Sequence, residues 1–171
     1  EGGIRSPLIV WAPRLMADGK AGSTDDASIL AAMDIAPSFL KLAGVSIPAD
    51  VRFDGGEHSA SLLGRETAAR KAPIFWRRPP DRKMVGEPPQ PQPDLAVRDG
   101  KWKVICDYDG GSPQLFDLNA DPGESKDLAA SQPDVTARLV KAVVEWHHSM
   151  PADRDPDRAK AGLMPEADKE V

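Results

Sequence analysis

An apolar segment near the start of the chain constrains the fold most. Pro7-Leu8-Ile9-Val10-Trp11 follows a glycine turn, Glu1-Gly2-Gly3, with neither an initiator methionine nor a signal peptide before it. A strand with apolar side chains at odd and even positions alike is buried on both faces, as in the centre of an α/β sheet. Such a strand needs neighbours, which most of the remaining sequence does not supply. We therefore expect this chain to be part of a larger protein.

Composition narrows the class of protein. The 171 residues are 40% hydrophobic and 29% charged, which is typical of a globular chain. The net charge of −5 gives no electrostatic reason to expect nucleic acid or an anionic membrane as a partner. No apolar run approaches the ~20 residues of a membrane span. The single cysteine, Cys106, lies in the apolar pattern Val104-Ile105-Cys106 and is predicted to be a buried, inert thiol.

The first half of the chain predicts little regular structure beyond one short helix. In Asp34–Gly44, Asp34 is a plausible N-cap, Pro37 falls in the first turn, and Gly44 is placed to end the helix in a left-handed cap. Residues 45–70 are predicted to be mostly loop, with one helical turn over residues 59–64. We expect the acidic pair Asp25-Asp26 to serve in capping or solvation rather than in metal binding.

The second half predicts a small antiparallel sheet and a helix. Strands are expected at residues 73–76, 95–98, 101–107 and 114–118, and Asp99-Gly100 is a strong hairpin turn. Ser131-Gln132-Pro133-Asp134 carries helix-start signals. One apolar stripe follows at helical spacing, consisting of Val135, Leu139, Ala142, Val143 and Trp146. Residues 77–93, which hold six prolines, are predicted to be a long surface loop, and residues 151–171 an extended tail.

Five stretches together resemble the type I sulfatases of the alkaline phosphatase superfamily, over roughly residues 1–150. Each motif alone is weak evidence for the family, whereas five motifs in the family's order are strong evidence. The stretches are the glycine turn and strand from Glu1 to Val10, the D-x-x-P helix from Asp34 to Leu40, Asp54-Gly55 with Leu62-Leu63-Gly64, Arg98-Asp99-Gly100-Lys101-Trp102-Lys103, and Leu115-Phe116-Asp117-Leu118 with Asp121-Pro122-Gly123-Glu124. The segment from Ile74 to Pro80 is similar to the N-acetylgalactosamine-6-sulfatase-like branch.

The resemblance implies an α/β fold, alkaline phosphatase-like, of which this chain holds the last part. Residues 1–70 would be the end of the large catalytic α/β domain. Residues 71–150 would form a C-terminal subdomain in which a small antiparallel sheet packs against a helix. Residues 151–171 would be the extended tail. Relatives of this kind are often exported, so the resemblance implies a periplasmic or secreted protein.

The resemblance also implies sulfate-ester hydrolysis by a formylglycine nucleophile and a calcium ion. Formylglycine forms from the cysteine or serine of a C/S-x-P-x-R motif, which does not occur here; Cys106 precedes Asp107-Tyr108-Asp109. The family's metal-binding aspartates and its last active-site lysine would lie upstream of Glu1. No catalytic or metal position therefore transfers to this sequence, and the 171-residue chain alone is predicted to be inactive.

Four residues are candidates for the rim of a substrate site. Trp76-Arg77-Arg78 would place an aromatic face beside two guanidinium groups, which suits a sulfated sugar. His58 stands where the family has an apolar or acidic residue. A solvated loop is the alternative interpretation for all four. For His147 and His148 we expect only a favourable interaction with a helix C-terminus.

The sequence thus predicts the C-terminal part of a sulfatase acting on a sulfated carbohydrate or an aryl sulfate, with the missing N-terminal part of the same protein as its partner. Two alternatives stay open. One is a phosphodiesterase or phosphonate monoester hydrolase of the same superfamily. The other is a non-enzymatic structural or interaction module. We also expect the isolated chain to self-associate, because its apolar strand lacks neighbours.

Overall fold

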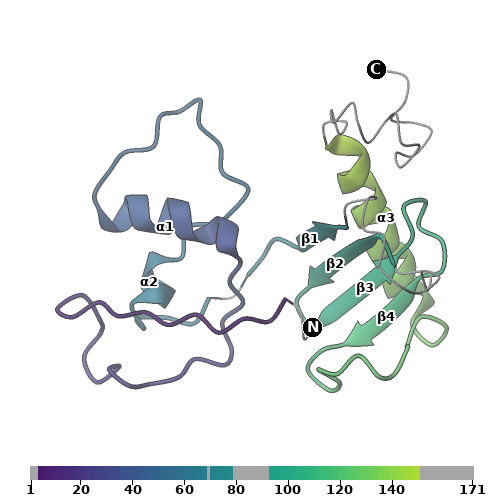
Figure 1. The fold of residues 1–171 in the computed structure, drawn as a ribbon, viewed down its shortest axis with the longest axis horizontal. Coiled ribbons are helices and arrows are strands. Elements are labelled where there is room, and N and C mark those ends of the chain that lie inside the picture. The colour runs from purple at the N-terminus through teal and green to yellow at the C-terminus, as the bar shows by residue number, and fades with distance from the viewer. Residues whose placement is uncertain (1–3, 69, 79–92, 151–171) are drawn as a thin grey trace, which may run out of the picture. The chain divides into compact units, whose positions relative to one another are not determined.

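The computed structural model describes residues 4–68, 70–78 and 93–150. They divide into two compact units, one formed by residues 3–72 and the other by the chain from Pro73 onward. Figure 1 shows that nearly all the regular structure of the second unit lies in one sheet and one long helix. Residues 79–92 of the loop predicted at 77–93, and the tail predicted at 151–171, lie outside the described residues, whereas Arg77 belongs to a strand.

The sheet of the second unit has four antiparallel strands in the order β1-β2-β3-β4. They are β1 (Ile74–Arg77), β2 (Leu95–Asp99), β3 (Trp102–Cys106) and β4 (Gln114–Asp117). Each strand lies within a residue or two of its predicted position. The hairpin between β2 and β3 turns at Gly100, whose φ of 58° suits a residue without a side chain.

A single helix, α3 (Pro133–Ser149), covers one face of this sheet (Figure 1). One row of paired residues, Phe75, Val97, Val104 and Leu115, crosses all four strands on that face. Leu139 and Val143 of the predicted stripe are fully buried against it, and Trp146 stacks on Phe75 with ring centroids 5.2 Å apart. Complete burial of a side chain of this size contributes about 1.5–3 kcal/mol, so α3 and the sheet form a self-sufficient core.

The first unit, residues 3–72, contains a 3-10 helix, η1 (Ala32–Asp34), and two short α-helices, α1 (Ile35–Leu42) and α2 (Ser59–Leu62). Pro37 lies in the first turn of α1, and Gly44 follows that helix with a φ of 68°, as the sequence predicts. The helix α2 presents Leu62 and the next residue, Leu63, to the interior, where both are buried. The rest of the described part of this unit is loop and turn.

The predicted strand at Pro7–Trp11 is wrong for this structure. Residues 5–11 lie outside any helix or strand, and Ile9 and Trp11 are 88% and 86% exposed. Among the described residues, no backbone hydrogen bond joins residues 4–11 to another segment. The two-sided apolar pattern predicts a strand, but a strand forms only where a neighbouring strand accepts and donates its hydrogen bonds.

A search of the described residues for a helix able to cross a membrane finds none that is long and apolar enough.

Candidate functional site

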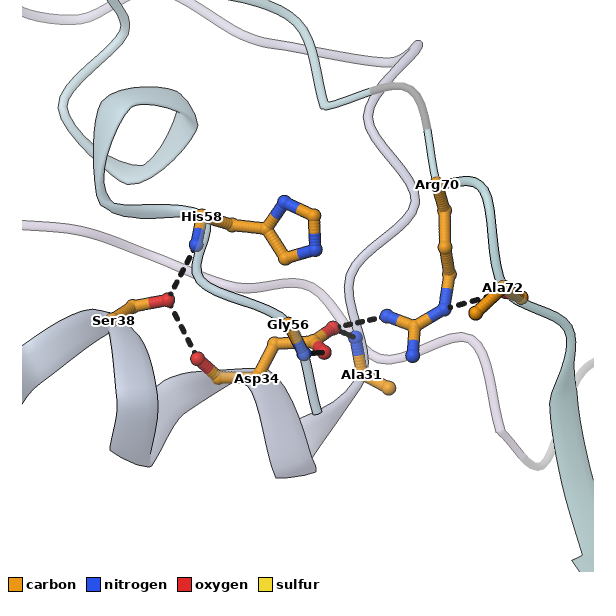
Figure 2. Close-up of polar contacts among 7 residues, drawn as sticks. All are labelled: Ala31, Asp34, Ser38, Gly56, His58, Arg70 and Ala72. Carbon is orange, nitrogen blue, oxygen red and sulfur yellow. Dashed lines mark hydrogen bonds and ion pairs between the residues drawn. The ribbon is translucent and has the colours of Figure 1, made fainter. Parts of the chain in front are cut away.

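The first unit is built around the carboxylate of Asp34, which is 1% exposed (Figure 2). Its Oδ1 accepts a hydrogen bond from the backbone N–H of Gly56 at 2.8 Å, and its Oδ2 accepts one from the N–H of Ala31 at 2.7 Å. Arg70 adds an ion pair through Nη1 and donates from Nε to the carbonyl of Ala72 at 3.1 Å. Asp34 occupies the predicted N-cap position of α1, but its side chain makes no capping hydrogen bond, because none of these donors belongs to α1.

Ser38 extends this network toward α2. Its hydroxyl donates to the carbonyl of Asp34 at 2.6 Å and accepts from the backbone N–H of His58 at 2.9 Å. Ser38 is fully buried, so both bonds are shielded from water. Asp34 and Ser38 together join three segments that are distant in sequence, around residues 31, 56–58 and 70–72.

Two glycines allow the close approach of these segments. A Cβ on Gly55 would overlap the carbonyl oxygen of Met33, and a Cβ on Gly56 would lie 2.8 Å from Nε2 of His58. The Asp54-Gly55 motif thus has a steric explanation, since the chain passes against the backbone that precedes α1. The carboxylate of Asp34 is fully compensated by its donors, so its role is to hold the unit together.

The imidazole of His58 extends from this network over Gly56 (Figure 2). It is half-buried, and among the described residues no group hydrogen bonds to its ring nitrogens. The neighbouring carboxylate of Glu57 is held by Ser59, whose backbone N–H donates to it at 2.6 Å, and hydrogen bonding to Ser59 lowers the pKa of Glu57. His58 therefore presents an imidazole with free nitrogens from a backbone that is fixed by Ser38.

The structure separates the predicted cluster at Trp76, Arg77 and Arg78. Arg77 pairs with Leu95 on the face that α3 covers, whereas Trp76 pairs with Ala96 on the opposite face. The three side chains therefore do not form one continuous platform, because successive residues of a strand point to opposite faces. His58 belongs to the other unit.

Arg78, directly after β1, is already engaged by its neighbours. Its guanidinium forms an ion pair with Asp94 at 2.8 Å, and its carbonyl accepts a hydrogen bond from the Tyr108 hydroxyl at 2.5 Å. The Tyr108 ring packs against His147, with ring centroids 5.0 Å apart. The end of β1 is thereby tied to the C-terminal turn of α3, where His147 and His148 lie as predicted.

A second buried ion pair lies in the sheet unit, between Lys103 of β3 and Glu124 in the turn after β4. The Nζ and Oε1 atoms are 2.5 Å apart, and the two side chains are 7% and 17% exposed. Glu124 has a φ of 54°, a conformation that L-residues rarely adopt. Burial alone would raise the pKa of Glu124, but hydrogen bonds and nearby positive charge, those of Lys103 first, bring this pKa below its usual value.

The described residues do not fit the two groups that sulfatase chemistry implies. Cys106 is fully buried, and its burial, with the charges of Asp107, Asp109 and Asp94, raises its pKa to about 11. Such a thiol stays protonated at neutral pH and is a poor nucleophile. No cluster of three or more histidine, cysteine, aspartate or glutamate side chains in the described part of the chain could hold a metal ion. Asp25 instead accepts hydrogen bonds from Ala27 and Ser28.

Sequence reasoning missed both buried ion pairs. It located Asp34 and Glu124 within motifs but found no partner for either one. The one general clue to these pairs is that a buried acid needs a compensating group. Arg70 lies 36 residues from Asp34, and Lys103 lies 21 residues from Glu124, so sequence spacing alone could not select them among the other basic residues.

Comparison with known proteins agrees with the resemblance to sulfatases. Residues 1–149 match a family model described as "N-sulphoglucosamine sulphohydrolase, C-terminal". Arylsulfatase K of Mus musculus is 30% identical over 141 residues, which is 81% of this chain and 24% of that protein. The N-acetylgalactosamine-6-O-sulfatase of Bacteroides thetaiotaomicron is 27% identical over 153 residues, which is 81% of this chain and 26% of that protein. The chain thus spans about a quarter of the length of these relatives.

Solved structures support the fold. The crystal structure of Ps i-CgsB aligns with a TM-score of 0.58 and 21% identity, over 83% of this chain and 31% of that one. A structure of Ps i-CgsB in complex with k-i-k-neocarrahexaose aligns with a TM-score of 0.55 and 22% identity, over 80% of this chain and 29% of that one. At these identities, the likeness establishes the arrangement of the chain and not its substrate.

Proposed function

Because this chain belongs to the family of N-sulphoglucosamine sulphohydrolase C-terminal domains, and its relatives are sulfatases, we propose that it forms the C-terminal part of an enzyme that hydrolyses sulfate esters. Residues 1–70 would complete the catalytic α/β domain, and residues 71–150 would form a subdomain beside it. The observation that carries the proposal is the family match over residues 1–149, combined with the share of each relative that this chain spans.

In this proposal the catalytic groups lie in the remainder of the longer protein. Formylglycine would supply the nucleophile, and calcium would polarise the sulfate. The described residues offer a fit to neither group. The contribution of this chain is to fold against the catalytic part and to shape the approach to its site. The 171-residue chain alone is then inactive, and the longer protein would be exported, in the periplasm or outside the cell.

The proposed substrate is a sulfated amino sugar. Two relatives from Bacteroides thetaiotaomicron are named for it, an N-acetylgalactosamine-6-O-sulfatase and an N-acetylglucosamine-6-O-sulfatase. Of the four rim candidates, we assign His58 to the substrate rim of the longer enzyme, since Trp76 and Arg77 point to opposite faces of the sheet and Arg78 is paired with Asp94. The free imidazole of His58 supports this assignment, because its nitrogens could hydrogen bond to a sulfate or hydroxyl oxygen.

The proposal is tested by sequencing the gene upstream of the Glu1 codon and assaying the longer product. We expect a C/S-x-P-x-R motif and calcium-dependent release of sulfate from N-acetylgalactosamine 6-sulfate. Replacing His58 with Ala should raise the KM for this substrate by about 10- to 150-fold, as expected for the loss of one hydrogen bond to a charged group. A longer product that cleaves phosphate diesters but releases no sulfate would contradict the proposal.

A further inference from the structure

The two outer strands of the sheet, β1 and β4, differ at their outer edges (Figure 1). The edge of β4 is occupied, because the N–H of Leu115 donates to Oδ1 of Asp127 at 3.0 Å and its carbonyl accepts from the N–H of Leu128 at 2.8 Å. Further along this edge, the carbonyl of Asp117 accepts from the N–H of Asp121 at 2.8 Å. The segment after β4 thus closes that edge of the sheet.

The outer edge of β1 has no such cover among the described residues. The N–H of Arg78 donates to the carbonyl of Asp94 at 2.8 Å, which fixes the alternation of hydrogen bonds between β1 and β2. Residues 74, 76 and 78 therefore turn their N–H and C=O groups toward β2, whereas Phe75 and Arg77 turn theirs outward. In the described part of the chain, no backbone hydrogen bond reaches these outward groups. An open strand edge of this kind is a template for pairing with another strand.

The sequence of β1 does little to discourage such pairing. Proteins protect open edges with charges and prolines, and Ile74-Phe75-Trp76 contains neither. Arg77 is the one charged residue of the strand and lies at its end. Prolines flank the strand instead, at positions 73 and 79, and they restrict the register in which a partner strand can pair.

Two copies of β1 can pair antiparallel around a two-fold axis, and the flanking prolines select one register. If Phe75 lay opposite itself, Arg77 would face Pro73, which has no N–H to donate. If Arg77 lay opposite itself, two guanidinium groups would meet and Phe75 would face Pro79. If Trp76 lies opposite itself, Phe75 faces Arg77 of the other copy, and every outward N–H of both residues meets a carbonyl.

The side chains agree with this third register. Trp76 is half-buried on the sheet face opposite α3, and the two Trp76 rings would be direct neighbours in a non-hydrogen-bonded pair, where side chains are closest. Aromatic pairs across strands are favourable. On the other face, Arg77 of each copy would lie beside Phe75 of the second copy, whose ring is stacked on Trp146, so a cation would meet an aromatic pair.

We infer that this chain forms a two-fold symmetric dimer in which the two β1 strands pair antiparallel about Trp76 and join both sheets into one. The partner is a second copy of this chain, because the open edge is complementary to itself in hydrogen bonds and in side chains. The inference concerns the sheet unit alone and does not rest on the proposed function. It also differs from the self-association that the sequence predicts through residues 7–11.

Cysteine cross-linking of the 171-residue chain tests the register. Residues directly opposite in an antiparallel pair have Cα atoms about 4.5–5.5 Å apart, which a disulfide can span. Under mild oxidation, Trp76→Cys should therefore give a covalent dimer, whereas Arg77→Cys, which lies opposite Phe75, should give about 10-fold less. Cys106 is fully buried and is present in both variants. Equal cross-linking of the two variants, or none in either, would overturn the register.

Two measurements on the unmodified chain test the pairing itself. Sedimentation velocity should show a dimer forming as the concentration rises. Over the same range, hydrogen exchange followed by NMR should slow by about 10-fold or more at the amides of Phe75 and Arg77, and change little at Trp76, whose amide faces β2. A chain that stays monomeric, or a dimer that leaves both amides unprotected, would overturn the inference. Protection of both amides at every concentration would also overturn it, because residues of the same chain would then occupy the edge.

A charge at the two-fold axis gives a matched pair of variants. Trp76→Lys places two like charges directly opposite each other and should abolish the dimer. Gln114→Lys, at an exposed residue of β4 on the same face of the sheet, is the control and should leave the dimer unchanged. Circular dichroism checks that both variants keep the fold. Equal dimerisation of the two variants would contradict the position assigned to Trp76.

Discussion

At the scale of single residues, two buried ion pairs each tie a segment with little regular structure to the rest of its unit. Asp34 and Arg70 do this in the first unit, and Lys103 and Glu124 in the second. Removal of either carboxylate would leave a buried cation without its charged partner. Loss of one partner from such a pair costs about 3–5 kcal/mol, far more than the loss of an exposed pair.

Replacing Asp34 with Asn tests this role in the first unit. The variant keeps the shape of the side chain but leaves Arg70 uncompensated, so we expect the free energy of local unfolding to fall by about 3 kcal/mol. Hydrogen exchange at the amides of Gly56 and His58 measures the change, because both depend on the network. Asp26→Asn, at an exposed residue, is the control. Unchanged exchange in the Asp34 variant would show that the network is not what holds the unit.

Glu124 gives the second unit a dependence on pH. Since hydrogen bonds and nearby positive charge, those of Lys103 first, hold the pKa of Glu124 below its usual value of 4.5 in the folded state, Glu124 stabilises the fold above about pH 4.5. That contribution is lost as the pH falls through the lower, folded-state pKa. Glu124→Gln should destabilise the unit by about 3 kcal/mol at pH 7 and weaken the decline in stability between pH 5 and 3.

Urea unfolding at a series of pH values, followed by tryptophan fluorescence, measures this effect. Glu145→Gln, on the exposed side of α3 with Lys141 3.8 Å away, is the matched control and should change stability by less than about 1 kcal/mol. A decline with pH that is equally steep in the Glu124 variant and in the unmodified protein would contradict the assignment.

At the scale of elements, the sheet unit follows from local sequence signals, whereas the first unit does not. Turn glycines, alternating strands and one apolar stripe located β2, β3, β4 and α3 to within a few residues. In the first unit, only α1 and the turn before Gly64 carry comparable signals. The strand predicted at Pro7–Trp11 does not form, because no backbone group among the described residues pairs with this segment.

The candidate site was predicted less completely than the fold, for a related reason. Motifs mark residues whose neighbours are local, such as Gly100 in its hairpin. The hydrogen bond between Ser38 and His58 and the ion pairs join residues that are far apart in sequence. The separation of Trp76 from Arg77 could have been predicted from strand alternation alone, and the cluster interpretation overlooked it.

The contact of α3 with the sheet is tested by Leu139→Ala. Leu139 is fully buried in the core of the sheet unit, so removing its side chain should cost about 2–5 kcal/mol. Lys141→Ala, on the exposed side of the same helix, should change the free energy of unfolding by less than about 0.5 kcal/mol. Equal effects of the two substitutions in urea unfolding would mean that α3 does not pack as described.

At the scale of the whole molecule, the two units should differ in their ability to fold alone. The sheet unit buries its core within residues 73–150, and Met150 is its one exposed large apolar residue among those described. A polypeptide of residues 73–150 should therefore unfold cooperatively in urea and keep the near-UV circular dichroism of its packed aromatic rings. A polypeptide of residues 4–72 should show neither property. A cooperative transition in residues 4–72 would contradict the claim that this unit needs further polypeptide.

The proposed function assigns catalysis to the longer protein: the sequence has no C/S-x-P-x-R motif, and the described residues hold no cluster of three or more metal-ligating side chains. The most direct measurement is sulfate release from 4-methylumbelliferyl sulfate by the purified 171-residue protein with calcium added. The account predicts a rate equal to that of the buffer blank. Calcium-dependent turnover that is proportional to the concentration of the chain would contradict it.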